Sequence, residues 1–224
     1  MPIPPITILS PPLLTTGIRA LDGLGASGAG LLAMAAGSSF KQILWVTYLS
    51  AEEFTPRAAV TVGLFNALFN SVNSLLFLAA ATTSLRSLPT IVLPSSGSST
   101  GMTALPLSVA VGAALYTVGL VVETVSEWQR RAFKARPENA GKVCKVGLWR
   151  WARHINYFGY SLWRGAYAMA ASGWIGGLAV GFLQGRDLGT RAVDVLDEYC
   201  GRRYGAQWAQ FKREVPYRII PGVY

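Results

Sequence analysis

The stretch ALPLSVAVGAALYTVGLVV, residues 104–122, is the clearest guide to the fold of this chain because it carries no charged side chain. A helix needs about 20 apolar residues to cross the ~30 Å hydrocarbon core of a bilayer, so this stretch predicts a membrane-spanning helix that ends at Glu123. Residues 58–82 are also long and apolar enough to span a bilayer. Residues 156–185 form a further apolar segment, interrupted by Arg164 and by the glycine-rich SGWIGG.

The composition favours the same fold class. Of the 224 residues, 51% are hydrophobic and only 14% are charged, with a mean hydropathy of +0.35. Soluble domains carry about 25% charged residues. Because the apolar excess lies in long runs, the sequence predicts an all-α, polytopic helical membrane protein with three to five membrane helices.

The chain divides into three parts by composition. Residues 1–28, rich in proline and glycine, predict a poorly ordered lead-in. Residues 29–103 are expected to hold the N-terminal membrane helices, with a loop at 87–102 that contains proline, glycine and serine. Within this part, polar GSSFKQ breaks residues 29–50 and predicts a weak or short pair of helices. Residues 104–224 are expected to form a helical C-terminal domain.

The charge of the chain is concentrated in its C-terminal half. Residues 1–127 hold four Lys/Arg and five Asp/Glu, whereas residues 128–224 hold sixteen and six. These basic residues alternate with tryptophan, tyrosine and apolar segments, which favours a membrane surface or a phosphate-bearing ligand over nucleic acid. The positive-inside tendency places this half in the cytosol. We therefore expect an integral membrane protein whose partners are the bilayer and a lipophilic small molecule.

The sequence offers too few ligands for a metal centre. Cys144, Cys200 and His154 are the only cysteines and the only histidine. Structural zinc needs four good ligands, and catalytic zinc usually takes three together with a water. Two cysteines also make no disulfide framework, so neither a metal nor a disulfide scaffold is expected.

Two acids follow the best spanning segment. Glu123 and Glu127 are four residues apart, so a helix places them on one face. Arg130, Arg131 and Lys134 follow within the next turns and could neutralise them. The pattern fits either a solvated, salt-bridged helix at the membrane surface or an acidic functional site.

Polar residues within the apolar segments are a second set of candidates. Asn66, Asn70 and Asn73 share one helix face, which favours hydrogen bonds between helices over the polar wall of a cavity. Arg164 is costly at membrane depth, so it is expected to face a cavity or a partner, or to extend to the interface.

The segment GLWRWARHINYFGY, residues 147–160, gathers further polar groups beside an apolar run. If residues 149–157 are helical, four of its side chains share a face. Guanidinium groups beside an imidazole suit an anion, whereas tryptophan and tyrosine also suit an interfacial belt. Both interpretations remain open, and the four side chains are Arg150, Arg153, His154 and Tyr157.

The motifs of the C-terminal half resemble those of a known family. The run ETVSEWQRRAFKARPENAGK (residues 123–142) and GLWRWARHINYFGY resemble the C-terminal domain of steroid 5-alpha-reductase-like proteins, in a functionally unassigned branch with the motif GLW-x-x-SRHPNYFGE. The ending DEYCGRRYGAQWAQFKREVPYRIIPGVY (residues 197–224) resembles the ends of sterol C14-reductases and 7-dehydrocholesterol reductases. The resemblance covers about residues 104–224. Isoprenylcysteine carboxyl methyltransferases share the broader architecture, so the fold alone does not distinguish the two activities.

The resemblance implies a reductase in the endoplasmic reticulum membrane that uses NADPH, bound at a site facing the cytosol. Its reaction would reduce a carbon–carbon double bond in a lipophilic substrate similar to a sterol or steroid. The resemblance also implies a phosphate-binding role for Arg130, Lys134 and Arg153, and proton transfer by Glu123, Glu127 or Tyr157. The remaining cofactor-binding residues that it implies are Trp149, His154, Asn156, Tyr157, Asp197, Cys200, Arg203 and Tyr204.

Two departures from the family pattern are visible. Ile155 replaces the proline of the family motif, and Tyr160 replaces its glutamate. The N-terminal half is also shorter than that of the sterol reductases. These departures keep two alternatives open: a methyltransferase of a lipid or prenylated substrate that uses S-adenosylmethionine, and a non-catalytic lipid-binding protein of the same fold.

Overall fold

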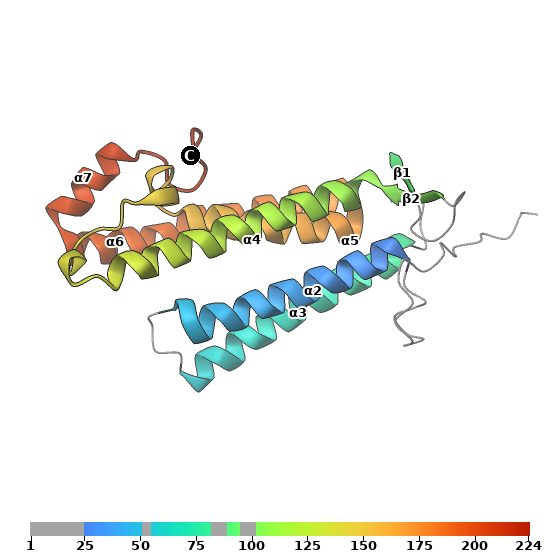
Figure 1. Cartoon of the computed structure of the whole chain (residues 1–224), viewed down its shortest axis with the longest axis horizontal. Coiled ribbons are helices and arrows are strands. Elements are labelled where there is room, and N and C mark those ends of the chain that lie inside the picture. Colours follow the sequence, from blue (N-terminus) through green and yellow to red (C-terminus); the bar gives the residue numbers. More distant parts are fainter. Residues whose placement is uncertain (1–24, 51–54, 82–88, 95–101) are drawn as a thin grey trace, which may run out of the picture.

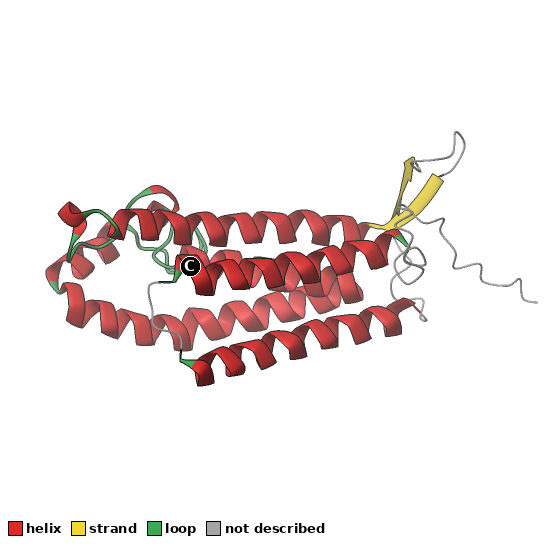
Figure 2. Cartoon of the chain, turned by 60° about the horizontal axis from the view of Figure 1, so that its bottom comes forward, coloured by secondary structure: helices red, strands yellow, loops and turns green. Residues whose placement is uncertain are grey.

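The computed structural model describes residues 25–50, 55–81, 89–94 and 102–224, and most of them are helical (Figures 1 and 2). Long helices lie side by side, and a two-stranded ribbon projects from one end (Figure 2). The elements are α2 (Ala26–Leu44), α3 (Pro56–Ala81), β1 (Thr90–Pro94), β2 (Met102–Pro106), α4 (Leu107–Lys134), α5 (Ile155–Asp187), α6 (Val193–Tyr204) and α7 (Ala206–Glu214).

Three described segments are long and apolar enough to cross a membrane, namely Pro56–Ala79, Leu107–Lys134 and Ile155–Tyr204. Their outward faces are apolar: Leu64, Leu75 and Leu178 are 66%, 65% and 66% exposed. Large apolar side chains exposed in such numbers are typical of a surface that faces lipid. The predicted polytopic helical membrane fold is confirmed.

Helix α5 is a hairpin of two helical limbs, residues 155–172 and 174–187, because the chain reverses at Gly173. This glycine has a φ of 83°, a conformation that side-chain-bearing residues rarely adopt. The limbs then pack closely, since a Cβ placed on Gly165 would lie 2.8 Å from the Cα of Gly181. The sequence SGWIGG, expected to interrupt one apolar stretch, is therefore the turn between two antiparallel limbs.

Small residues bring α4 into direct contact with the first limb of α5. A Cβ on Gly119 would lie 2.6 Å from the backbone nitrogen of Trp163 and 2.8 Å from the carbonyl oxygen of Gly159. A Cβ on Gly112 would lie 2.8 Å from the carbonyl oxygen of Ala166. Glycine and alanine at such contacts let membrane helices gain van der Waals packing that larger side chains prevent.

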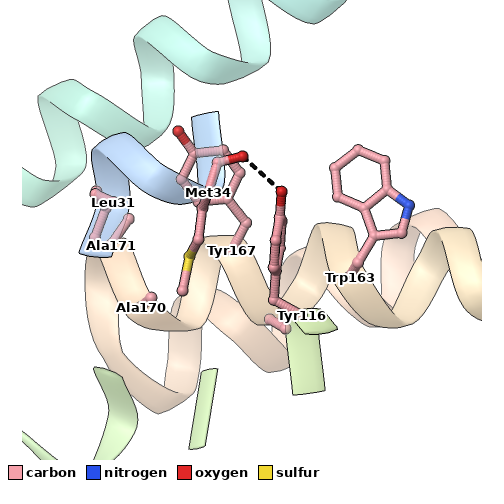
Figure 3. Packing of buried hydrophobic residues seen from close by; sticks show 8 residues of the cluster. Leu31, Met34, Tyr116, Trp163, Tyr167, Ala170 and Ala171 are labelled. Atoms are coloured by element: carbon pink, nitrogen blue, oxygen red, sulfur yellow. Dashed lines mark hydrogen bonds between the residues drawn. The ribbon is translucent and has the colours of Figure 1, made fainter. Parts of the chain in front are cut away.

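An aromatic cluster joins α2 to this α4–α5 pair (Figure 3). The Tyr116 hydroxyl donates a hydrogen bond of 2.6 Å to the carbonyl oxygen of Met34 in α2. The Tyr116 ring also meets Trp163 and Tyr167 edge-on, with centroids 6.0 and 6.1 Å apart. Edge-to-face pairs of this kind add stability beyond the area they bury.

Several local predictions were wrong in detail. Residues 29–50 form one helix, α2, followed by a π-helical turn at Trp45–Leu49, instead of a helix pair. Part of the loop expected at 87–102 forms β1, which pairs antiparallel with β2. Residues 151–154 are not helical, since a 3-10 turn at Gly147–Arg150 precedes the start of α5 at Ile155.

Other predictions concern the two ends of the chain. Helix α2 begins at Ala26, inside the predicted lead-in, and residues 1–24 lie outside the described residues. The expected surface helix at 190–213 is divided at Gly205 into α6 and α7. Helices α6 and α7 and the C-terminus lie at one end of the bundle, opposite β1 and β2 (Figure 1). The predicted site residues of the C-terminal half gather around this α6–α7 end.

The close approach at Gly119 predicts a specific sensitivity. The Gly119→Leu substitution inserts a side chain against backbone atoms and should destabilise the fold by about 1–3 kcal/mol. Gly63→Leu is the matched control, because no heavy atom lies within 4 Å of a Cβ at Gly63. Melting temperatures of the detergent-purified variants, followed by tryptophan fluorescence, should fall only for Gly119→Leu. Equal melting temperatures would contradict this contact.

Candidate functional site

A cavity of about 510 Å³ lies near the α6–α7 end, between α3, α4 and the α5 hairpin. We call it the acidic cavity. Its apolar wall includes Trp45, Phe65, Phe69 and Leu183. The three predicted catalytic residues all line it, and its polar lining consists of Glu123, Glu127, Asn156, Tyr157, Tyr160, Gln184, Asp187 and Arg191.

Glu123 is a buried acid held from two sides. Lys41 of α2 forms an ion pair with Oε1, and the indole Nε1 of Trp163 donates to Oε2 over 2.6 Å. Lys41 is itself buried. A buried charge pair of this kind is stable only when both members keep their partners. Glu123 therefore links α2, α4 and α5 at the wall of the acidic cavity.

Glu127 lies one helical turn nearer the α6–α7 end and is only 3% exposed. Its Oε2 pairs with the Arg130 guanidinium over 2.6 Å, and its Oε1 accepts a hydrogen bond of 2.8 Å from the Asn156 amide. The other amide atom, Asn156 Oδ1, is buried and has no hydrogen-bond partner within the described residues. An unused acceptor therefore lies buried beside a paired carboxylate, behind the wall of the acidic cavity.

A buried arginine supports the aromatic side of the same cavity. Arg164 is 2% exposed, and its Nε donates to the Tyr160 hydroxyl over 3.1 Å. Its guanidinium also bonds to Asn66 of α3 and lies 4.4 Å from the centroid of the Trp163 ring. Arg164 therefore faces partners, as predicted for a charge at membrane depth. Asn66 makes the expected bond between helices.

The basic residues of the predicted cofactor site follow Glu127 along the end of α4, outside the cavity lining, and Arg130 is linked to the cavity by its ion pair with Glu127. The Lys134 ammonium donates to the Tyr204 hydroxyl over 2.7 Å and lies 4.7 Å from the centroid of the Tyr204 ring. Arg130 stacks 5.5 Å from the Trp149 ring, whose Nε1 donates to the carbonyl of Ser126 over 2.8 Å. These contacts bring Arg130, Lys134, Trp149 and Tyr204 together. Arg203 is exposed and stacks on Tyr204 at 5.7 Å.

Arg153 and His154 hold the C-terminal segment in place. Arg153 Nη1 donates to the carbonyl oxygens of Val215 and Pro216 over 2.6 and 2.9 Å. The backbone N–H groups of Arg153 and His154 bond to the carbonyls of Tyr217 and Arg218 over 3.0 and 2.8 Å. Arg153 is 7% exposed, so most of its donors are turned toward the protein.

The remaining predicted residues lie between α6 and α7. Asp197 accepts from Trp208 Nε1 over 2.8 Å and pairs with Lys212 over 2.9 Å, which fastens α7 to α6. Cys200 packs against the apolar cluster around Trp208 and Phe211. Within the described residues, no group of three or more His, Cys, Asp or Glu side chains could hold a metal ion.

Sequence reasoning did not assign Lys41, Trp163 or Tyr160 to the site. One signal for Lys41 was available, because it is the only charged residue in residues 29–50 and a lone charge in an apolar segment indicates a buried partner. Tyr160 was noted only as a departure from the family motif. Trp163 carried no signal, since a tryptophan in a membrane helix is more often part of the packing.

The chain is similar to several known proteins. Residues 63–184 match the model of a family described as "Protein of unknown function (DUF1295)". The chain is 35% identical over 194 residues to the "Probable O-methyltransferase ustE" of Ustilaginoidea virens, covering 86% of this chain and 65% of that protein. It is 27% identical over 161 residues to the "Delta(14)-sterol reductase" of Neurospora crassa, covering 52% of this chain and 33% of that protein.

A third relative matches over a shorter region. The chain is 36% identical over 86 residues to the "Probable 7-dehydrocholesterol reductase" of Acanthamoeba polyphaga mimivirus, covering 38% of this chain and 19% of that protein. The chain therefore spans less than two thirds of the length of each of these relatives. The matches confirm that it is related both to sterol reductases and to a protein named as a methyltransferase.

The environment of His154 predicts a pH-dependent stability. Burial, reinforced by the adjacent Arg153 charge, lowers the pKa of His154 from 6.5 to about 4. Below pH 6.5 His154 is protonated in the unfolded chain but stays neutral in the folded chain. The free energy of unfolding should therefore fall as the pH drops toward 4, by up to about 3 kcal/mol.

His154→Phe keeps an aromatic ring against Tyr157, which stacks on His154 with centroids 5.6 Å apart, but removes the titration. Melting temperatures measured from pH 7.5 to 5 should therefore fall less steeply for this variant than for the unmodified chain. Identical slopes would show that His154 titrates normally in the folded protein.

Proposed function

This chain belongs to the family described as "Protein of unknown function (DUF1295)", and we propose that it is a membrane-bound reductase that uses NADPH. Its reaction would reduce a carbon–carbon double bond in a lipophilic, sterol-like substrate. One observation carries the proposal: a basic and aromatic group around Arg130 and Lys134 adjoins a cavity that combines an apolar wall with buried acids. We place the protein in the endoplasmic reticulum membrane, with its α6–α7 end in the cytosol.

The acidic cavity suits a lipophilic substrate. Its volume of about 510 Å³ falls within the range of small-molecule sites, which are mostly apolar with a few placed polar groups. Phe65, Phe69 and Leu183 supply the apolar wall, while the polar groups come from α4, the start of α5 and the end of its second limb. Such a wall would bind a hydrocarbon skeleton and present one edge of it to Glu123 and Glu127.

The neighbouring basic residues suit the phosphates of NADPH. Arg130 has a half-exposed side chain and uses only one of its nitrogens on Glu127, so it keeps donors for an anion. Lys134 adds a second cation beside the partly exposed ring of Tyr204, while the buried Trp149 ring holds Arg130 in place. The unpaired Asn156 Oδ1 would accept a hydrogen bond from an amide. NADPH, when bound, supplies a hydride.

The residues of the cavity would supply the proton. Reduction of a double bond adds a hydride to one carbon and a proton to its neighbour, so a group of the protein must donate that proton. Tyr157, Glu123 and Glu127 are the proposed proton-transfer groups, because all three line the cavity. A tyrosine hydroxyl has a proton to donate, whereas the two ion-paired carboxylates would first have to take up the proton that they deliver. Arg130, paired with Glu127, would stabilise the carboxylate that remains after transfer from this acid.

A second function is a methyltransferase that uses S-adenosylmethionine. The observation in its favour is the extent of similarity, since the match to the probable O-methyltransferase covers most of this chain. The same apolar cavity would hold a lipophilic acceptor, and a carboxylate such as Glu127 would take up the proton that the methylated hydroxyl loses. The two functions require different cofactors, and this difference makes them separable by experiment.

Cofactor binding tests both functions directly. The purified full chain, in detergent, would be titrated with NADPH and, separately, with S-adenosylmethionine while tryptophan fluorescence is followed. We expect saturable binding of NADPH. Lys134→Gln should weaken it about tenfold, because a hydrogen bond to a charged group contributes about 1.5–3 kcal/mol.

Lys142→Gln is the matched control, because Lys142 is exposed and meets Lys134 only through its backbone carbonyl, which accepts from Lys134 Nζ over 2.9 Å and is retained in the variant. Its NADPH affinity should equal that of the unmodified chain. Saturable binding of S-adenosylmethionine without binding of NADPH would favour the methyltransferase and overturn the reductase. Equal losses of NADPH affinity in the two lysine variants would show that Lys134 does not contact NADPH.

A further inference from the structure

A second cavity, of about 630 Å³, lies on the other face of the second limb of α5. Val180, Leu183 and Asp187 line the acidic cavity, whereas Leu178, Gly181 and Phe182 line this one. The first limb, α4 and the C-terminal segment contribute the rest of its wall. We call it the glycine groove, and the function proposed above makes no use of it.

The floor of the groove is a row of glycines. Gly177, Gly181, Gly185 and Gly189 are four residues apart, so they share one face of the helix. From Gly177 to Thr190 the helix rises about 20 Å, which is more than half of the ~30 Å hydrocarbon core of a bilayer. Leu178 and Phe182, which border the row, are 66% and 69% exposed. The groove is therefore long, apolar and open at its side.

Two polar groups mark the α6 end of this groove. The Ser161 hydroxyl is buried, lines the groove beside Gly185, and has no hydrogen-bond partner within the described residues. Arg186 is exposed, and among the described residues its guanidinium forms no ion pair. The nearest charged residue along the helix, Asp187, is already paired with Arg191 over 2.7 Å.

These features define the chemistry of an occupant. A long apolar groove accepts a hydrocarbon chain, and an unpaired guanidinium at its end attracts an anion. The buried Ser161 hydroxyl lies where it can donate to a carbonyl oxygen next to that anion. An ester-linked acyl chain followed by a phosphate has all three groups in this order, and the surrounding bilayer supplies such molecules.

We propose that the glycine groove binds one acyl chain of an anionic phospholipid, with Ser161 at the ester carbonyl and Arg186 at the phosphate headgroup. The absence of side chains at Gly181 and Gly185, where a Cβ would lie 3.5 and 3.8 Å from the nearest heavy atom, leaves room for the chain, whereas Gly177 and Gly189 pack closely against Met169 and Tyr224. The basic α6–α7 end would favour anionic lipids in the adjacent leaflet. This inference does not depend on which reaction the acidic cavity supports.

Native mass spectrometry of the full chain provides the test, with dioleoylphosphatidylglycerol and dioleoylphosphatidylcholine as probes at equal concentration. The anionic lipid should bind more tightly by about fivefold, since one basic residue near an anionic headgroup contributes about 1 kcal/mol. Arg186→Gln should remove this preference. Gly185→Leu should reduce the binding of both lipids, because its side chain would occupy the groove.

The control is Arg213→Gln, which removes an exposed arginine of α7 outside the groove. Gly185→Leu is expected to fold, because the nearest atom to a Cβ at this position is 3.8 Å away. Equal binding of the two lipids to the unmodified chain would overturn the proposal. Equal losses of the preference for the anionic lipid in Arg186→Gln and Arg213→Gln would also overturn it. Undiminished lipid binding in Gly185→Leu would do the same.

Discussion

The arrangement of the bundle depends on one buried carboxylate, that of Glu123. Lys41 reaches it from α2 and Trp163 reaches it from α5, so three helices meet at a single acidic group. A buried charge is costly unless it is partnered, which fixes how these helices lie relative to one another. The same carboxylate lines the acidic cavity. The group that stabilises the bundle therefore also shapes the candidate site.

This contact is possible only because α4 and α5 approach closely. A Cβ on Gly159 would lie 2.6 Å from the backbone nitrogen of Glu123, so only glycine lets the first limb of α5 pass at that level. Trp163, one turn further along, can then reach the carboxylate. The reversal at Gly173 adds a second limb whose two faces line different cavities. Glycines thus determine both where the helices touch and where space remains.

The membrane helices and the acidic pair could be predicted from the sequence because both depend on local patterns, namely apolar length and a four-residue spacing. The reversal at Gly173 could not, since SGWIGG is equally compatible with a kink. The partners of Arg153 could not be predicted either, because Val215 and Pro216 lie 62 and 63 residues away in the chain. The sequence indicates which groups are polar, while tertiary packing decides whether a guanidinium meets a phosphate or a backbone carbonyl.

The most direct test of the central role of Glu123 is a double-mutant cycle on the free energy of unfolding in detergent. Lys41→Met leaves an unpaired buried carboxylate and should destabilise the protein by about 3–5 kcal/mol. Adding Glu123→Gln removes that charge, so the double variant should be more stable than Lys41→Met alone. If the two substitutions destabilise the protein additively, the ion pair is not what holds the three helices together.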